Sequence, residues 1–582
     1  MITGMTAGVR QEPRDAARPG TPRRPRLPAL LALLVGLAGV GYRLALVLAD
    51  APPTNSDEAT MGLAALHIAR GEGFPVWFYG QAYMGTLEAY LAAPLVALVG
   101  PSVLALRLPT LALYALFLAL SWRLARRLGG DHWYALLVVG FLALGSDRVV
   151  KNQLIAGGGY PELNPAGVAL ALLTVGLCAG GTASGRAGRA APGIDAEPER
   201  PRAAARLRRW AAWGLVSGLM LWVDPLILPY VLATGAVLVA RRRRELAGRA
   251  GLVVTAALLL GAAPMLLDSL RHGRNPLTAV LGASGGDAAA SWAERLYGGL
   301  VLGPPLGMGF CSPGHCAGWQ LWWALAFPIL LLVAAAAAWR TLRTPLPPAD
   351  LGELSFGRDD KSPRSGQLAG RGDRWVSAAV RLALLAGAAA VLLAYTVSSS
   401  AGQTPVESAR YLSCLAVATP ALLWPLWRAV RAGLFPPRPR ARAAGLVALT
   451  VLAAILGTAA VATVTAIRRA PAIHAEADRH RALVDALREL GVRHVRGGYW
   501  TCNRLTFATG EEVVCAVVDD ELRPGFDRLP TYRRAVADDP GAAWVAPVGS
   551  PLAARLDRQL GPDRGDLEVV TVEGWRVYRP HP

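Results

Sequence analysis

Cysteine and lysine are both scarce in this sequence. Six cysteines among 582 residues are too few for a fold held together by disulfide bonds. Lysine occurs only at Lys151 and Lys361, so arginine supplies almost all of the positive charge in a chain of formal net charge +19. Aromatic residues do not alternate with these arginines, and the stacking surface that nucleic-acid-binding proteins use is therefore missing. We expect no nucleic acid among its partners.

Long polar stretches are also few. Hydrophobic residues make up 53% of the chain and its mean hydropathy is +0.34, which excludes an ordinary soluble enzyme. Helices that cross a membrane explain this composition, because each needs about 20 predominantly apolar residues. The chain is expected to be a polytopic α-helical membrane protein with about eleven transmembrane helices. The apolar runs lie at residues 27–49, 103–125, 133–147, 164–181, 210–223, 225–240, 251–267, 319–339, 376–397, 411–427 and 443–466.

The arginines mark one side of the membrane. If residues 1–27 form a disordered basic arm in the cytoplasm, the connecting segments alternate between arginine-rich and arginine-poor along the chain. Basic residues concentrate in cytoplasmic segments, so the pattern places the N-terminus in the cytoplasm and the C-terminus outside. A cleaved signal peptide is the alternative interpretation of residues 27–49, although this run is longer than the usual apolar core of such a peptide.

The sequence changes in character after residue 467. RHRALVDALRELGV has the periodicity of an amphipathic helix, and VRHVRGGYW, EEVVCAVV, AAWVAPV and LEVVTVEGWRVYRP have the composition of strands. We therefore predict a transmembrane domain over residues 28–467 and a soluble extracytoplasmic α/β domain over residues 468–582. No internal repeat is apparent, which argues against a transporter built from inverted repeats.

Two adjacent carboxylates follow the first apolar run, in NSDEATMGLAALHIARGEGFPVWFYGQAYMGTLEAYLAAP (residues 55–94). Asn55 followed by Glu58 fits the start of a helix, because a capping side chain and an acid both stabilise a helix N-terminus. Capping accounts for Glu58 but leaves Asp57 unexplained, since one cap needs one side chain. The next residues fit a helix lying in the membrane interface, and GQAYMGTLEAYLAAPLVALVG fits a second one. The outer loop 50–102 is thus unusually long for a connector.

Several of these segments resemble the GT-C superfamily, membrane glycosyltransferases that take sugars from polyprenyl phosphates and include the protein O-mannosyltransferases. The resemblance rests on the Asp-Glu pair, on GQAYMGTLEAYLAAP, on SVLALRLPTLALYALFLALSWRLARRLGG, and on ESARYLSCLAVATPAL, which is similar to the RYL segment of the family. GGYWTCNRLTFATGEEV resembles the C-terminal domain of uncharacterised bacterial members. The chain departs from the aminoarabinose transferase branch, which has Lys-Pro-Pro where LEAYLAAP stands, so the donor contacts of that branch cannot be transferred.

The resemblance implies an inverting transfer from a polyprenyl-phosphate sugar donor to a hydroxyl of a glycan, lipid or protein acceptor at the outer face. Asp57 would be the catalytic base that takes the acceptor proton, and a carboxylate also stabilises an oxocarbenium-like transition state. Glu58 would cap the helix or support Asp57. The departing phosphate needs a cation. Arg410 and Lys151 are the candidates, with Arg148 as an alternative to Lys151.

Other side chains of the outer segments are candidates for the same site. Glu88 and Glu162 are candidate second carboxylates, each with the alternative role of anchoring its loop. A divalent metal ion could join one of them to Asp57, as in some branches of the family, but no ligand spacing requires one. The candidate contacts to the sugar or the acceptor are Gln81, Tyr83, Tyr411, Tyr499 and Trp500. Tyr499 and Trp500 have the alternative role of packing inside the α/β domain.

Two pairs of cysteines are close enough in sequence to form disulfide bonds outside the cell. Cys311 and Cys316 flank His315 in FCSPGHCAGW, where a zinc site is the alternative, but further ligands are missing nearby. Cys502 and Cys515 are the second pair.

Two other functions are compatible with the sequence. A transporter or flippase for a lipid-linked saccharide would need polar side chains along the spans, and few are present apart from Asp224. A non-catalytic envelope assembly protein would bind its partners through residues 468–582. No motif in the sequence identifies the sugar. The resemblance to the family alone suggests mannose or arabinose.

Overall fold

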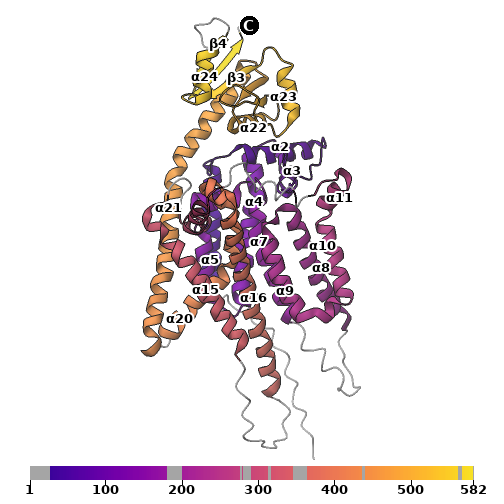
Figure 1. Ribbon diagram of the computed structural model, residues 1–582, viewed down its shortest axis with the longest axis vertical. Helices are drawn as coiled ribbons and strands as arrows, with labels where there is room; N and C mark the ends of the chain where they lie inside the picture. The colour runs from indigo at the N-terminus through magenta and orange to yellow at the C-terminus, as the bar shows by residue number, and fades with distance from the viewer. Residues whose placement is uncertain are drawn as a thin grey trace, which may run out of the picture.

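The computed structural model describes residues 27–179, 199–275, 278, 290–311, 316–344, 363–434, 439–560 and 567–580. The arm expected at residues 1–27 lies outside this part of the chain except for Leu27, the first residue of α1. Figure 1 shows an elongated molecule in which long helices run side by side and a small domain with strands caps one end. Two helices of the first outer loop, α2 (Ser56–Arg70) and α3 (Leu87–Val99), lie between these two parts.

Apolar helices form the larger part of the molecule. The longer ones are α1 (Leu27–Leu48), α4 (Val103–Arg127), α5 (His132–Ala143), α6 (Asp147–Leu154), α7 (Tyr160–Ala179), α8 (Glu199–Val223), α9 (Leu228–Leu246), α10 (Arg249–Gly261), α11 (Ala263–His272), α15 (Trp322–Arg343), α16 (Pro363–Val397), α20 (Trp424–Leu434) and α21 (Pro439–Glu489). Short helical segments connect them: η2 (Pro225–Ile227), α13 (Trp292–Leu296), η3 (Tyr297–Leu302), α14 (Gly303–Gly307), η4 (Gly318–Leu321), α17 (Ser399–Gln403), α18 (Pro405–Ser408), η5 (Ala409–Ala418) and α19 (Thr419–Leu422).

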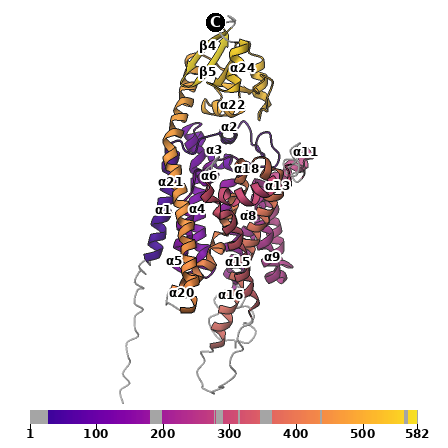
Figure 2. The ribbon, with the colours of Figure 1, turned by 60° about the vertical axis from the view of Figure 1, so that its left-hand side comes forward.

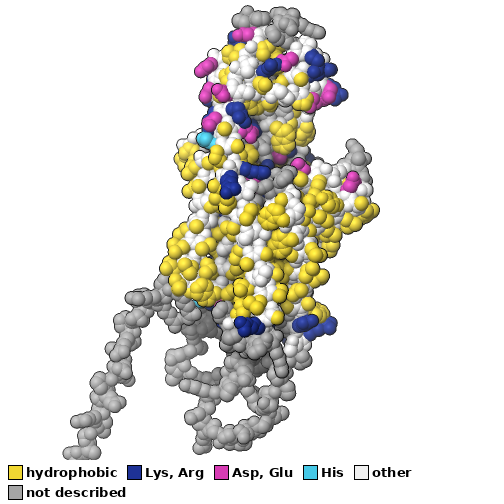
Figure 3. All heavy atoms as spheres, turned by 90° about the vertical axis from the view of Figure 1, so that its left-hand side faces the viewer, with side chains coloured by type: hydrophobic (Ala, Val, Ile, Leu, Met, Phe, Trp, Pro, Cys, Tyr) yellow, Lys and Arg dark blue, Asp and Glu magenta, His cyan; other side chains and the backbone are white. Residues whose placement is uncertain are grey.

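Eight helical segments of the described chain are long and apolar enough to cross a membrane, or ten when each of two bent helix pairs counts as one span. The bent pairs are α5 with α6, at 91°, and α10 with α11, at 63°. The expected number of about eleven also included the run at 210–223. That run is the second half of α8, whose first half is rich in arginine, so α8 is not among these segments although it packs along α10 in the bundle. Figure 3 shows hydrophobic side chains covering the sides of this part, with Lys and Arg side chains at its lower end.

A five-stranded sheet forms the core of the capping domain, in the order β2-β1-β3-β5-β4. β1 is parallel to β2 and β3, and β5 is antiparallel to β3 and β4. The strand expected over residues 492–500 is shorter, because Gly498 is the N-cap of a helix that begins at Tyr499. The elements are β1 (His494–Gly497), α22 (Tyr499–Ala508), β2 (Val514–Val517), α23 (Pro530–Ala537), β3 (Ala543–Pro547), α24 (Pro551–Leu560), β4 (Leu567–Val572) and β5 (Trp575–Pro580).

One helix joins the two parts of the molecule. α21 has 51 residues, runs without interruption along the bundle and continues into the sheet domain (Figure 2). At 1.5 Å per residue such a helix is about 75 Å long. Its last turns carry Leu483 and Leu487 into the core of the sheet domain, against Val495. The boundary expected after residue 467 therefore falls inside a continuous helix.

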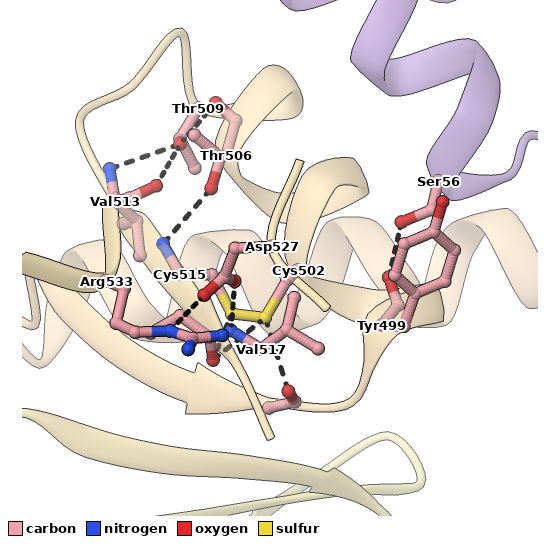
Figure 4. The surroundings of a disulfide bond; sticks show 12 residues. Ser56, Tyr499, Cys502, Thr506, Thr509, Val513, Cys515, Val517, Asp527 and Arg533 are labelled. Atoms are coloured by element: carbon pink, nitrogen blue, oxygen red, sulfur yellow. Dashed lines mark hydrogen bonds and ion pairs between the residues drawn. A yellow bond between two sulfur atoms is a disulfide. The ribbon is translucent and has the colours of Figure 1, made fainter. Parts of the chain in front are cut away.

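Two disulfide bonds are present. One joins Cys311 to Cys316 and the other joins Cys502 to Cys515, while Cys178 and Cys414 are free and buried. The Cys502–Cys515 bond fastens α22 to β2 inside the sheet domain (Figure 4). His315, the ligand of the alternative zinc site, lies outside the described residues.

Helix α22 rests directly on α2. The ring of Phe507 packs on Gly62 so closely that a Cβ at Gly62 would come within 2.6 Å of it. Ser56 Oγ donates a hydrogen bond to the carbonyl of Tyr499, the first residue of α22 (Figure 4). The sheet domain is therefore held on the first outer loop through its own helix N-terminus.

An ionic contact closes the other end of the same interface. The Glu511 carboxylate accepts hydrogen bonds from Arg70 Nη1 and from the Tyr532 hydroxyl, both at 2.6 Å, and lies 3.0 Å from His67 Nε2. Burial alone would raise the pKa of Glu511, but these hydrogen bonds and the neighbouring charges outweigh it and lower the pKa to about 2. The carboxylate is thus charged at neutral pH and ties the sheet domain to the end of α2.

Candidate active site

Asn55 starts α2 and thereby sets the directions of the two adjacent carboxylates. Its Oδ1 accepts the backbone N–H of Glu58 at 2.9 Å, which places both Asp57 and Glu58 in the first turn of the helix. Successive side chains on a helix point about 100° apart. Asp57 and Glu58 therefore face different surroundings: Glu58 turns into the membrane part of the protein and Asp57 turns towards the sheet domain.

Glu58 forms a buried ion pair. Its Oε1 and Oε2 accept hydrogen bonds from Arg107 Nε and Nη2, each at 2.7 Å, and Thr54 Oγ1 donates to the same carboxylate. Both side chains of the ion pair are fully buried. Two parallel bonds to one guanidinium are the strongest form of such a pair. Glu58 is therefore committed to holding α2 on α4, and its carboxylate is not available to a substrate.

Asp57 is held by the sheet domain but keeps one oxygen open. Its Oδ1 accepts hydrogen bonds from the Tyr499 hydroxyl at 2.8 Å and from Arg528 Nη2 at 2.9 Å. The side chain is 16% exposed, and its second oxygen receives no hydrogen bond from the described residues. A carboxylate with one oxygen fixed and the other open has a defined orientation and can still accept a proton.

Arg528 is the residue of this site that the sequence analysis missed. It comes from the segment before α23, and its Nε donates to the Tyr499 hydroxyl at 2.8 Å, while Nη1 donates to the carbonyl of Tyr79 at 3.2 Å. Its guanidinium also lies 4.5 Å from the ring centroid of Phe78. Nothing in the local sequence distinguishes Arg528 from the other arginines of the C-terminal region, because its function depends on how the two parts of the chain dock.

Two cations from distant segments lie near Asp57. Lys151 on α6 and Arg410 at the start of η5 are both within electrostatic range of Asp57. The side chain of Lys151 makes no hydrogen bond or ion pair with any residue in the described part of the chain. The Arg410 guanidinium lies 5.5 Å from the ring centroid of Tyr411 and 5.9 Å from that of Tyr160. Arg148 differs from both, because its Nη2 donates to the carbonyl of Val406.

The other candidate carboxylates, Glu88 and Glu162, are buried, as is Asp224. Glu88 accepts the backbone N–H groups of Gly158 and Gly159 at 3.2 and 3.1 Å, and burial raises its pKa. Both oxygens of Glu162, a residue that is 3% exposed, are buried without a hydrogen bond from the described residues. Asp224 accepts the N–H of Leu226 at 2.8 Å, and burial raises its pKa to about 7.

The charged partner that Asp57 contacts is a cation, Arg528. In the described residues, the one group of three or more side chains whose ligand atoms could share a metal ion is His67, Glu72 and Glu511, which does not include Asp57. That group is itself occupied by the ion pair of Arg70 with Glu511.

The remaining candidates surround the opening of the site. Tyr83 is half-buried and within electrostatic range of Arg410 and Arg528, while Gln81 Oε1 is buried without a hydrogen bond from the described chain. Trp500 is 62% exposed, with its ring edge-on to Tyr499 at 5.0 Å between centroids. The alternative role in the domain core is therefore wrong for Trp500, and Tyr499 contacts Asp57.

We expect Arg528→Gln to lower the turnover number by about tenfold to a hundredfold, because a slightly misplaced catalytic group loses that much rate. Arg528 acts through Asp57, so the KM for the donor should change little, and Arg528→Lys should restore part of the rate. Steady-state kinetics of the reaction proposed below measures both quantities. Arg523→Gln is the matched control, since Arg523 is exposed and pairs only with Asp519 and Glu521. Equal losses in both glutamine variants would contradict this function of Arg528.

The fold and the site define a class. The chain is a multi-pass helical membrane protein in which a sheet domain docks over a carboxylate at one end of the helical bundle. No family model matches the sequence, and no curated protein matches it significantly.

Solved structures show which fold this is. The chain is similar to ArnT, the aminoarabinose transferase of Cupriavidus metallidurans, in a crystal structure with undecaprenyl phosphate: the TM-score is 0.51 at 15% identity, over 95% of this chain and 97% of that one. The Archaeoglobus fulgidus oligosaccharyltransferase in its apo form gives a TM-score of 0.47 at 12% identity, over 90% of this chain and 69% of that one. The GT-C-like fold implied by the sequence motifs is thus confirmed by the similarity to ArnT.

Proposed function

We propose that this protein is an inverting glycosyltransferase that moves a sugar from a polyprenyl phosphate to a hydroxyl acceptor at the outer face of a bacterial plasma membrane. One observation carries the proposal: Asp57 has an open oxygen and lies within electrostatic range of two cations, Lys151 and Arg410, where the bundle meets the sheet domain. The GT-C-like fold supports it, because ArnT, which shares this fold, was crystallised with undecaprenyl phosphate.

The geometry suits a single displacement. The acceptor oxygen attacks the anomeric carbon while its proton passes to the open oxygen of Asp57, and the bond from that carbon to the phosphate oxygen breaks. The polyprenyl phosphate leaves as an anion and needs no proton. Arg528 and Tyr499 hold the other oxygen of Asp57 and so fix the direction of its open lone pairs. Attack opposite the leaving group inverts the anomeric configuration.

The two cations take the place of an acid catalyst. We propose that Lys151 and Arg410 bind the donor phosphate and neutralise the charge that develops on it. Charge-assisted contacts of this kind are strongest where water is excluded, and both side chains are half-buried.

Arg410→Gln and Lys151→Gln should each raise the KM for the lipid donor by about tenfold to a hundredfold, since a hydrogen bond to a charged group contributes roughly 1.5–3 kcal/mol. The measurement is initial rate against donor concentration. Arg469→Gln is the control, because Arg469 is a half-exposed arginine that pairs with Asp147. An unchanged KM in both Arg410→Gln and Lys151→Gln would remove these residues from the phosphate site.

Mass spectrometry of envelope glycans, lipids and proteins from a deletion strain tests the function directly. The proposal expects one sugar addition to disappear and the corresponding polyprenyl-phosphate sugar to accumulate. Transport of a labelled lipid-linked saccharide by the purified chain in liposomes, without transfer to any acceptor, would instead show a transporter. A non-catalytic assembly protein would lose its function on deletion of residues 468–582 but retain it in Asp57→Asn.

A further inference from the structure

A groove at the end of the bundle opposite Asp57 carries four arginines and no carboxylate among its described lining residues. It has a volume of about 830 Å³. It lies between the C-terminal ends of α4 and α7 and the arginine-rich first half of α8. The arginines are Arg123, Arg126, Arg127 and Arg209.

The positive charge of the groove is not neutralised by the described protein. Arg126 Nη1 donates to the carbonyl of Gly130 at 2.8 Å, and Arg209 Nη1 donates to that of Gly176 at 3.4 Å. Arg123 and Arg127 are exposed, and none of the four forms an ion pair within the described part of the chain. Guanidinium groups bind phosphate through paired hydrogen bonds, so an uncompensated group of them favours an anionic ligand with phosphate oxygens.

The groove lies at the depth of lipid headgroups. α4 has 25 residues, about 37 Å at 1.5 Å per residue, which exceeds the roughly 30 Å of a hydrocarbon core. Arg107 near its start binds Glu58 beside the Asp57 site, so its last turn reaches the other membrane surface. The lining also contains Trp122, a residue type enriched at membrane interfaces, and half-buried Leu172.

We propose that this groove binds an anionic phospholipid of the leaflet opposite the Asp57 site, which is the cytoplasmic leaflet in the proposed topology. The phosphate is held by Arg123, Arg127 and Arg209, and the acyl chains lie along Leu172 and Leu173. Four arginines that have no counter-charge among the described residues match a headgroup with two phosphates best, as in cardiolipin. Basic pockets between transmembrane helices are a known means of binding such lipids. The inference requires only the bundle and does not depend on the transfer reaction.

Native mass spectrometry of the full chain in detergent, titrated with cardiolipin or phosphatidylcholine, tests the proposal. The unmodified chain should retain one cardiolipin and no comparable phosphatidylcholine. The triple variant Arg123→Gln, Arg127→Gln, Arg209→Gln should bind cardiolipin on the order of a hundredfold more weakly, since each cation contributes roughly 1 kcal/mol. The matched control replaces three exposed arginines elsewhere in α9 and α15 by glutamine, namely Arg243, Arg244 and Arg340.

A variant with lysine at the same three groove positions separates binding from folding. It keeps the charge, so it should bind more tightly than the glutamine variant, whereas damage to the fold would weaken both. Equal weakening in the groove and control variants would show a general surface effect and overturn the proposal. Displacement of the lipid by inorganic phosphate at similar concentration would also overturn it, because the ligand would then be a free anion.

Discussion

Asp57→Asn should reduce sugar transfer by about 10³-fold, because the amide cannot take the acceptor proton. The change keeps the size of the side chain and its hydrogen bond to Tyr499, so expression and membrane insertion should remain normal. The measurement is the amount of the missing glycan that the variant restores in a deletion strain, together with the transfer rate of the purified protein.

Asp50→Asn is the matched control for this loss. Asp50 is also an acid of the outer surface, but it pairs with His474 and Arg481 instead of facing the cations of the site. Its φ of 56° is a left-handed conformation that Asn adopts readily, so the control should fold and retain full activity. Full sugar transfer by Asp57→Asn would show that Asp57 is not the catalytic base. The proposed fold and substrate class would be unaffected by that result.

Arg107→Met should lower the free energy of unfolding by about 3–5 kcal/mol, because it leaves the Glu58 carboxylate buried without its cation. The expected result is a much lower midpoint of thermal unfolding in detergent. Size-exclusion chromatography after heating measures how much folded protein remains at each temperature. The double variant Glu58→Leu with Arg107→Met removes both charges and should recover most of the loss. Arg340→Met, at an exposed position, should change little. If the double variant were as unstable as Arg107→Met, the unpaired Glu58 charge would not be the cause of the lost stability.

Two adjacent carboxylates thus act on different properties of one protein. Asp57→Asn is expected to change the rate but not the stability, and Arg107→Met, acting through Glu58, is expected to change the stability first. The reason is local, since the Asn55 cap directs neighbouring side chains of α2 into opposite surroundings.

Much of this arrangement could be predicted from short-range patterns. The spacing of Asn55 and Glu58 predicted the start of α2, and the apolar runs predicted most helices of the bundle. The position of Arg410 was predicted from its place at the membrane edge. In each case the information lies within a few turns of helix, where periodicity and capping act.

Contacts between distant segments could not be predicted in the same way. Arg528 reaches Asp57 only because α22 docks on α2, and no pattern around residue 528 reports that docking. Arg107 did carry a signal, since an arginine inside an apolar run needs a partner, but the sequence does not say which acid that partner is. The ends of the spans are harder to predict, because bent helices and the arginine-rich start of α8 break the apolar runs into short segments.

The ion pair of Asp57 with Arg528 joins residues 471 positions apart. During synthesis Asp57 reaches the far side of the membrane early, whereas Arg528 emerges from the ribosome almost at the end of the chain. In the mechanism proposed above, a partly made protein would hold the base beside the lipid donor without the residue that orients it. Transfer by that mechanism would therefore begin only after the last domain has folded onto α2.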